Sequence, residues 1–338
     1  YCEVIDVLQR TESDGLLYII GNGFDLIHGV KSSYYDFRDS MSPTHIVRFT
    51  LEAYIHKGDI WGEFENNLAY LDRAMLMGVI DDCLYDLEVP DEDDDSFSAA
   101  DFFAAQDIAM TPVNVLTSEL PKQFRNWVNS LRCSLKNKLL APIIKEKARY
   151  LTFNYTDFLE QLYRIPVSQI NYIHGCQKNK KDELILGHGH NIDEVFDEWY
   201  QENKDKTEYQ PIYHGKNKKI DRNDNPIYLA YFLQNEEEGN WRSQMRYDAI
   251  DNARRILEEY YEMSAKKTKD VVLRNAAYFK SLQNVRNIVV IGHSLSEVDY
   301  PYFSEIIKQN LTPKDLRWFI SFYSDADNKR IDIFMSYM

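Results

Sequence analysis

Residues 16–25 run Leu16-Leu17-Tyr18-Ile19-Ile20-Gly21-Asn22-Gly23-Phe24-Asp25. A short apolar, β-branched run that ends in Gly-x-Gly is typical of a buried strand followed by a tight turn. Glycines in such a turn let the backbone approach a ligand, and free amide groups at the start of the next helix favour an anion. The usual dinucleotide fingerprint has a third glycine three positions later, where this chain has Leu26. The stretch therefore predicts a strand and a turn, and it leaves nucleotide binding open.

The composition indicates a folded, acidic protein. The chain has 338 residues, 44% of them hydrophobic and 14% aromatic, which is enough for one large domain or two ordinary ones. Its formal net charge of −15 argues against bulk nucleic-acid binding, which needs a dense basic surface. The four cysteines are far apart, so neither a four-cysteine zinc site nor a disulfide framework is expected. No signal peptide or membrane-length apolar run is visible, so we expect a cytoplasmic protein without a membrane partner.

Short apolar runs that end in polar turns recur along the chain. After the first strand, the pattern predicts strands at residues 149–153, 169–173, 184–186, 287–291 and 316–322. All of these except the last run directly into turns that contain Gly, His or Asn. In a parallel α/β sheet such turns meet at the carboxyl edge, where ligands bind. The sequence therefore predicts an α/β fold with a site at that edge.

Helical periodicity separates these strands. Apolar residues three to four positions apart predict helices within residues 44–87 and 98–147. We expect residues 44–147 to form a large helical insertion into an α/β core made of residues 1–43 and 148–338. Residues 193–265 are expected to act as a lid or helical segment within that core, and a long helix is predicted for residues 241–264.

Histidines near the strand ends are candidates for chemistry. A lone histidine of this kind usually donates a hydrogen bond to a backbone carbonyl, but an imidazole near neutral pKa can also act as a general base. His174 and His293 both directly follow a predicted strand, and this shared position favours a role in chemistry over a structural role for these two. The candidates by position are His28, His174, His188, His190 and His293.

Asn154 and three aspartates have other possible roles. The Asn154 amide could orient a water or a ribose hydroxyl without adding charge, or it could form an Asx turn. Asp25 and Asp157 could be helix N-caps, and Asp299 could belong to a turn. With the histidines, these carboxylates could also bind a metal. Because no ligand spacing such as H-E-x-x-H is present, we expect no metal.

Several blocks together resemble the AbiH family of bacterial abortive-infection proteins. The resemblance extends from about residue 16 to the C-terminus, with the blocks in the family's order. It implies a role in defence against phage. The blocks that carry it are residues 19–29, 152–160, 173–175, 185–189 and 292–303.

The same blocks also resemble a degenerate sirtuin. Gly21, Gly23 and Gly29 keep the glycine spacing of the sirtuin opening, and Asp36-Phe37-Arg38 follows it after an insertion. Residues 152–159 are similar to the sirtuin Thr-Gln-Asn-Ile-Asp-x-Leu, residues 174–175 to its His-Gly, and residues 292–295 to its Gly-Thr-Ser-Leu. The resemblance implies a sirtuin-like, Rossmann-type parallel sheet flanked by helices. The zinc module of sirtuins is absent, which disfavours protein deacylation.

The sirtuin resemblance implies an NAD+ glycohydrolase that releases nicotinamide and ADP-ribose. Asn154 and His174 would be catalytic, as would Asp157, although Asp157 lies one residue too far from Asn154 to match the family. NAD would be the substrate, with control by homo-oligomerisation or by a phage-derived or operon-encoded trigger. Two alternatives are a metal-dependent hydrolase or nuclease that uses the His/Asp cluster, and a non-catalytic nucleotide sensor that binds a partner. The residues assigned to NAD binding are Gly21, Asn22, Gly23, Phe24, Asp25, Arg38, Gly292, His293, Ser294 and Asp299.

Overall fold

A computed structural model describes residues 15–85, 99–206, 213–214, 218–219 and 241–338. The chain divides into two compact units. The sheet unit comprises Tyr1–Met41, Lys122–Leu186 and Lys266–Met338, and the helical unit comprises Ser42–Pro121 and Gly187–Ala265. The helical unit therefore contains most of the predicted insertion at residues 44–147 and the whole of the predicted lid at residues 193–265.

The sheet unit is built on five parallel strands in the order β3-β2-β1-β6-β7. The chain builds β2 and β3 on one side of β1 before it crosses to the other side, so the strand order reverses between β1 and β6. This all-parallel sheet confirms the predicted α/β class. The strands are β1 (Leu16–Ile20), β2 (Arg149–Thr152), β3 (Ile170–Tyr172), β6 (Asn287–Ile291) and β7 (Arg317–Ile320).

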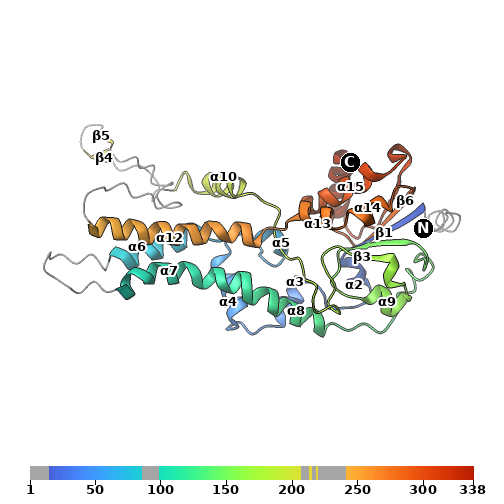
Figure 1. Ribbon diagram of the computed structural model, residues 1–338, viewed down its shortest axis with the longest axis horizontal. Helices are drawn as coiled ribbons and strands as arrows, with labels where there is room; N and C mark the ends of the chain where they lie inside the picture. Colours follow the sequence, from blue (N-terminus) through green and yellow to red (C-terminus); the bar gives the residue numbers. More distant parts are fainter. Residues whose placement is uncertain (1–14, 86–98, 207–212, 215–217, 220–240) are drawn as a thin grey trace. The chain divides into compact units, whose positions relative to one another are not determined.

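Helices cover both faces of the sheet (Figure 1). These helices shield both faces of the sheet from water. The side chains of β1 are therefore apolar on both faces rather than alternately apolar and polar. One face carries α13 (Thr268–Arg274), α14 (Ala276–Lys280), α15 (Tyr300–Gln309) and α16 (Asp325–Tyr337). The other face carries α2 (Gly23–Ile27) and α9 (Phe158–Tyr163). The sheet unit also contains α3 (Tyr34–Asp39) and the 3-10 turns η3 (Val167–Gln169), η5 (Glu297–Asp299) and η6 (Pro313–Asp315).

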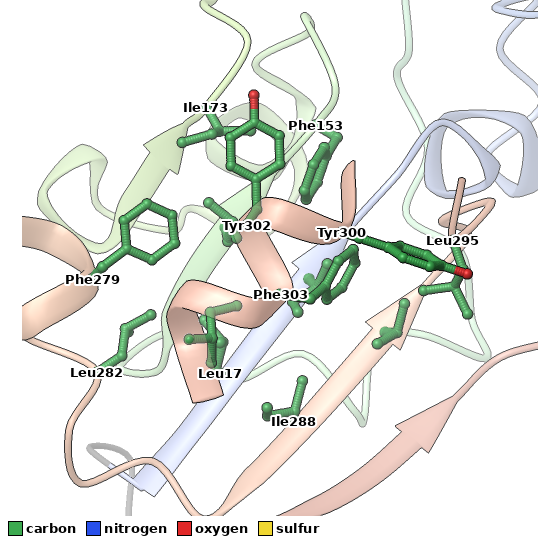
Figure 2. Close-up of a cluster of buried hydrophobic side chains, with 14 of the residues drawn as sticks. Leu17, Phe153, Ile173, Phe279, Leu282, Ile288, Leu295, Tyr300, Tyr302 and Phe303 are labelled. Atoms are coloured by element: carbon green, nitrogen blue, oxygen red, sulfur yellow. The ribbon is translucent and has the colours of Figure 1, made fainter. Parts of the chain in front are cut away.

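Alternation along β1 divides its side chains between two cores. Leu17 packs with Tyr302 and Phe303 of α15 (Figure 2). Ile19 belongs to the same core, and all four side chains are fully buried. Tyr18 points to the opposite face and joins the second core. Because successive side chains of a strand point to opposite faces, this one strand anchors both layers of helices.

Two sequence predictions within the sheet unit are wrong. Residues 184–186 are not a strand: the Ile185 N–H donates to the His174 carbonyl at 2.9 Å, and the Ile185 carbonyl accepts from the Tyr155 hydroxyl at 2.8 Å. Residues 131–147 form loops and turns rather than helix. Their apolar side chains, including Leu131 and Ile144, pack against the core on the face of α2 and α9. The periodicity there reflects packing of a loop on the sheet.

The helical unit consists mainly of long helices. Among them, α6, α7 and α12 pack side by side (Figure 1). Ala253, Leu257 and Tyr260 of α12 are fully buried, as the apolar periodicity predicts. Its elements are α4 (Ile46–Tyr54), α5 (Phe64–Asn67), α6 (Arg73–Tyr85), α7 (Ala99–Asn114), the π-helix η2 (Val115–Glu119), α10 (Ile192–Asn203), α12 (Trp241–Ser264), β4 (Tyr213–His214) and β5 (Lys218–Lys219). The chain passes into the sheet unit within α8 (Leu120–Ser130).

Candidate functional site

Two glycine-containing turns meet where the strand order reverses. A Cβ atom on Gly21 would lie 2.5 Å from the His293 Cα, and one on Gly23 would lie 2.5 Å from the Gly292 Cα. The Gly23 N–H donates to the Gly292 carbonyl at 2.8 Å. Gly292 itself has φ of +63°, a conformation that side chains disfavour. These glycines are therefore needed for contact between the turns after β1 and β6, and the Gly23 amide is already occupied.

The residues around the first turn are held by the protein itself. The Asn22 side chain donates to the Ser32 carbonyl at 2.8 Å. Phe24 is 1% exposed and packs in the core. His28 contacts the Phe24 carbonyl through Nδ1 at 2.6 Å and the Tyr163 hydroxyl through Nε2 at 2.8 Å. His28 thus has the structural role that is common for a lone histidine.

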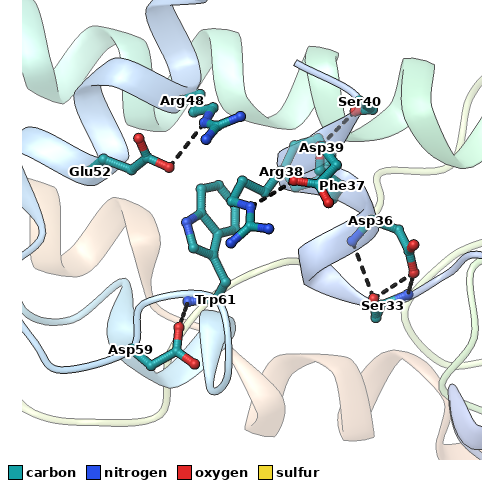
Figure 3. A network of polar contacts seen from close by, with 10 residues as sticks. All are labelled: Ser33, Asp36, Phe37, Arg38, Asp39, Ser40, Arg48, Glu52, Asp59 and Trp61. Carbon is teal, nitrogen blue, oxygen red and sulfur yellow. Dashed lines mark hydrogen bonds and ion pairs between the residues drawn. The ribbon is translucent and has the colours of Figure 1, made fainter. Parts of the chain in front are cut away.

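Arg38 lies on α3, which begins with a capping box. The Ser33 hydroxyl accepts from the Asp36 N–H at 3.2 Å, and the Asp36 carboxylate accepts from the Ser33 N–H at 3.0 Å (Figure 3). Arg38 Nε donates to the Asp39 carboxylate at 2.8 Å (Figure 3). The Arg38 charge is therefore paired within α3.

Asp25 is a buried carboxylate held by two neutral donors. It is 2% exposed, although it follows directly from the glycine turn. Asn154 Nδ2 donates to its Oδ1 at 2.9 Å, and the Thr156 hydroxyl donates to its Oδ2 at 2.7 Å. Burial raises the pKa of Asp25 to about 6, and the hydrogen bonds from Thr156 and Asn154 limit the rise. Asp25 can therefore change its charge near neutral pH.

The partners of Asp25 come from the turn after β2. In the parallel register Ile20 lies opposite Thr152, so the first residues beyond both strands lie side by side. Asn154 is 6% exposed, and its Oδ1 has no hydrogen-bond partner among the residues that the structure describes. With one N–H on Asp25, the amide retains an acceptor for a ligand. The sequence did not single out Thr156, although it lies in a block that carries the family resemblance.

Asp157 belongs to a separate set of contacts. Its Oδ1 accepts from Gln161 Nε2 at 2.7 Å and from Gln177 Nε2 at 3.1 Å. It precedes α9 as the N-cap residue, without a side-chain capping bond. Asp157 thus joins α9 to the segment after β3, and nothing in the spacing of the sequence points to Gln177.

Four ionisable side chains form a second buried cluster, the Asp299 cluster. Asp299, in η5 ahead of α15, faces His174 Nε2 at 3.8 Å and Lys266 Nζ at 3.6 Å through Oδ1. Its Oδ2 faces His293 Nε2 at 3.5 Å. Burial alone would raise the pKa of Asp299, but the Lys266 charge and the His293 hydrogen bond outweigh burial and lower it. Asp299 is therefore ionised at neutral pH.

Aromatic rings and a backbone amide orient the two imidazoles of this cluster. Phe153 contacts both His174 and His293 edge-on, with ring centroids 5.1 and 4.2 Å apart. The Leu295 N–H donates to His293 Nδ1 at 2.9 Å, so a neutral His293 carries its proton on Nε2, toward Asp299. Burial holds the pKa of His174 well below its usual value, with Lys266 acting in the same direction. His174 is thus a neutral imidazole at physiological pH.

The other candidate residues lie apart from these contacts. Ser294 is exposed beyond β6. His188 and His190 belong to the helical unit, where His188 Nε2 lies 3.2 Å from the Ser264 hydroxyl and His190 lies 3.8 Å from Glu194. Within the described ranges, no three His, Cys, Asp or Glu side chains are arranged to hold a metal ion.

Among known proteins, the chain matches one family model. No curated protein and no solved structure matches the chain. In the described part of the chain, no helix is long and apolar enough to span a membrane. The family model for bacteriophage abortive infection AbiH matches residues 17–322 and includes both turns, Asp25, Asn154 and the Asp299 cluster. The AbiH resemblance is therefore confirmed, and the chain belongs to the AbiH family of bacteriophage abortive-infection proteins.

Proposed function

We propose that this protein is an abortive-infection effector that hydrolyses NAD+ to nicotinamide and ADP-ribose. The family supplies the defence role. The sirtuin resemblance and a parallel sheet whose order reverses between β1 and β6, as in Rossmann-type folds, support a nucleotide substrate. Cleavage of NAD+ would stop host metabolism before the phage matures.

The observation that carries this proposal is the buried Asp25 carboxylate at the carboxyl edge of the sheet. A buried charge costs free energy, so a fold that keeps one at a ligand-binding edge commonly uses it. Asn154 and Thr156 hold both carboxylate oxygens without neutralising them. A ribose is a suitable partner because its hydroxyl groups donate to a carboxylate. A contact with ribose hydroxyls would explain why a carboxylate lies at a site for a negatively charged nucleotide.

The chemistry of NAD+ suits a single carboxylate. The nicotinamide ring carries a positive charge and departs as a neutral base, with the electron pair of the broken C–N bond, so it needs no general acid. Positive charge then develops on the ribose, as in glycoside hydrolysis, and a nearby carboxylate stabilises it. Asp25 would supply that charge, and the free acceptor of Asn154 would orient the ribose or the attacking water.

His174 would complete the reaction as a general base. Water forms the new C–O bond at the ribose carbon, and its proton must leave. A neutral imidazole accepts a proton, and the low pKa of His174 keeps it in that form. The proton then passes to solvent. Because Asp25, Asn154 and His174 are at most 6% exposed, we expect turnover to require a trigger or oligomer that admits the substrate.

The experiment is incubation of the purified protein with NAD+, followed by identification of the products. Asn154→Ala, His174→Gln and Asp25→Asn should each lower nicotinamide release at least 100-fold, on the order of the contribution of one catalytic group. Asn328→Ala and His56→Gln change exposed side chains of the same types and should leave release unchanged. Full activity in all three site variants would refute the mechanism. Turnover only with a divalent ion would favour a metal-dependent hydrolase, and binding without turnover would favour a nucleotide sensor.

A further inference from the structure

Lys266 is a buried lysine that the sequence does not distinguish from its neighbours. It lies in a lysine-rich segment with Lys267 and Lys269, which are both exposed. The Lys266 side chain is 1% exposed, and its Nζ lies 3.6 Å from Asp299 Oδ1. Lysines are almost never fully buried unless they are paired. The fold thus takes one lysine of three into the Asp299 cluster.

The Asp299 carboxylate faces more than one group that can carry a positive charge. Beside Lys266, it faces His174 through Oδ1 and His293 through Oδ2. A carboxylate with no other partner raises the pKa of a nearby imidazole, because it stabilises the protonated form. An ammonium charge on the same carboxylate offsets this effect and also repels a second positive charge.

We propose that Lys266 is a positioning residue that neutralises Asp299, so that His174 remains an unprotonated base held in place by an ion pair. The role of His174 as a base rests on the proposed function. The charge relationship between Lys266, Asp299 and His174 is independent of NAD+.

The surroundings of His174 set the direction of the effect. The rings of Phe153, Tyr155 and Tyr302 pack against its imidazole, and His174 is 2% exposed. The charged and titratable groups that act on it are Lys266, Asp299 and His293. Burial lowers its pKa most, Lys266 lowers it next and Asp299 raises it. Removal of the Lys266 charge leaves Asp299 to oppose burial, so the pKa of His174 must rise.

The test is an NMR titration of the full chain carrying isotope-labelled histidine. Loss of one signal in His174→Gln identifies the His174 imidazole. In Lys266→Met its pKa should rise by about one to three pH units, the usual effect of one nearby charge. Lys266→Arg keeps the charge and should leave the pKa near its original value. Lys269→Met removes an exposed lysine of the same segment and should have no effect.

An unchanged His174 pKa in Lys266→Met would overturn the inference, and so would a rise of the same size in Lys266→Arg. If Lys266→Met does not fold, Lys266→Gln removes the charge while keeping a hydrogen-bond donor for Asp299, and the same rise is expected. Nicotinamide release gives a second readout, since the acid limb of its pH profile should move to higher pH in Lys266→Met. If the wild-type protein releases no nicotinamide, the proposed function fails, and the titration still decides the role of Lys266.

Discussion

Replacing Asp25 with asparagine should make the protein more stable and inactive at the same time. The asparagine side chain keeps the shape of the aspartate, accepts from Asn154 and donates to the Thr156 hydroxyl, so the local hydrogen bonds survive. What is lost is a buried charge on a side chain that is 2% exposed. A stabilising substitution that abolishes function is typical of a strained or desolvated active-site group.

The size and sign of this effect follow from the pKa of Asp25. Folding raises this pKa from 3.8 to about 6. The native state therefore takes up a proton more readily than the unfolded chain between pH 6 and 4. Above pH 6 the wild-type protein carries the full cost of the buried charge, about 3 kcal/mol. At pH 4 most of that cost has disappeared, because the native carboxyl is protonated and the unfolded carboxyl is close to its pKa of 3.8.

Urea unfolding at pH 8 and at pH 4 measures this difference. The free energy of unfolding of Asp25→Asn should exceed that of the wild type by up to about 3 kcal/mol at pH 8, and the two should agree to within about 0.5 kcal/mol at pH 4. Asp332→Asn removes an exposed carboxylate of the sheet unit and should change stability by less than about 0.5 kcal/mol. A variant that is no more stable than wild type at pH 8, or more stable by the same amount at both pH values, would show that the Asp25 charge is not costly in the folded protein.

Two further predictions concern a turn and a histidine. Gly292→Ala should cost clearly more than about 1 kcal/mol of unfolding free energy, because a Cβ there lies 2.4 Å from the Phe24 nitrogen at positive φ. Gly29→Ala is the control, because Gly29 has a φ of +77° but open space around an added Cβ, so it measures the cost of positive φ alone. An equal loss of unfolding free energy in the two variants, measured by urea unfolding, would contradict the tight contact at Gly292. Burial lowers the pKa of His188 from 6.5 to about 4, so the contribution of this imidazole to the unfolding free energy should fall by about 3 kcal/mol as the pH drops from 6.5 to 4, opposite in sign to that of Asp25. His188→Gln should remove that part of the pH dependence, and an unaltered profile would count against it.

Local sequence patterns predicted the frame of the sheet. The run from Leu16 to Ile20 became the central strand because it is apolar on both faces, and the Gly-x-Gly after it became a tight turn. Residues 184–186 have a similar composition, but the structure pairs them with no strand among the described residues. A strand depends on pairing with a neighbour, and that pairing cannot be seen in the sequence of one segment. The helix predicted for residues 131–147 is wrong because apolar side chains can pack against the core from a loop as well as from a helix.

The candidate site was only partly visible in the sequence. Polar residues at strand ends identified Asp25, Asn154, His174 and His293 as candidates. Their grouping into pairs depends on strand order and register, which place the turns after β1 and β2 side by side. Lys266 could not be found at all, because one buried lysine within a lysine-rich segment has no local signature.

The most direct test of the central claim is the fate of NAD+ incubated with the purified protein and a chelator. We expect nicotinamide and ADP-ribose in equal amounts from the wild-type protein, and neither product from Asn154→Ala. If a trigger is needed, the same result is expected once infected-cell extract is added. Intact NAD+ under both conditions would show that the protein is not an NAD+ hydrolase, and cleavage only when a divalent metal is restored would show that it is a metal-dependent enzyme.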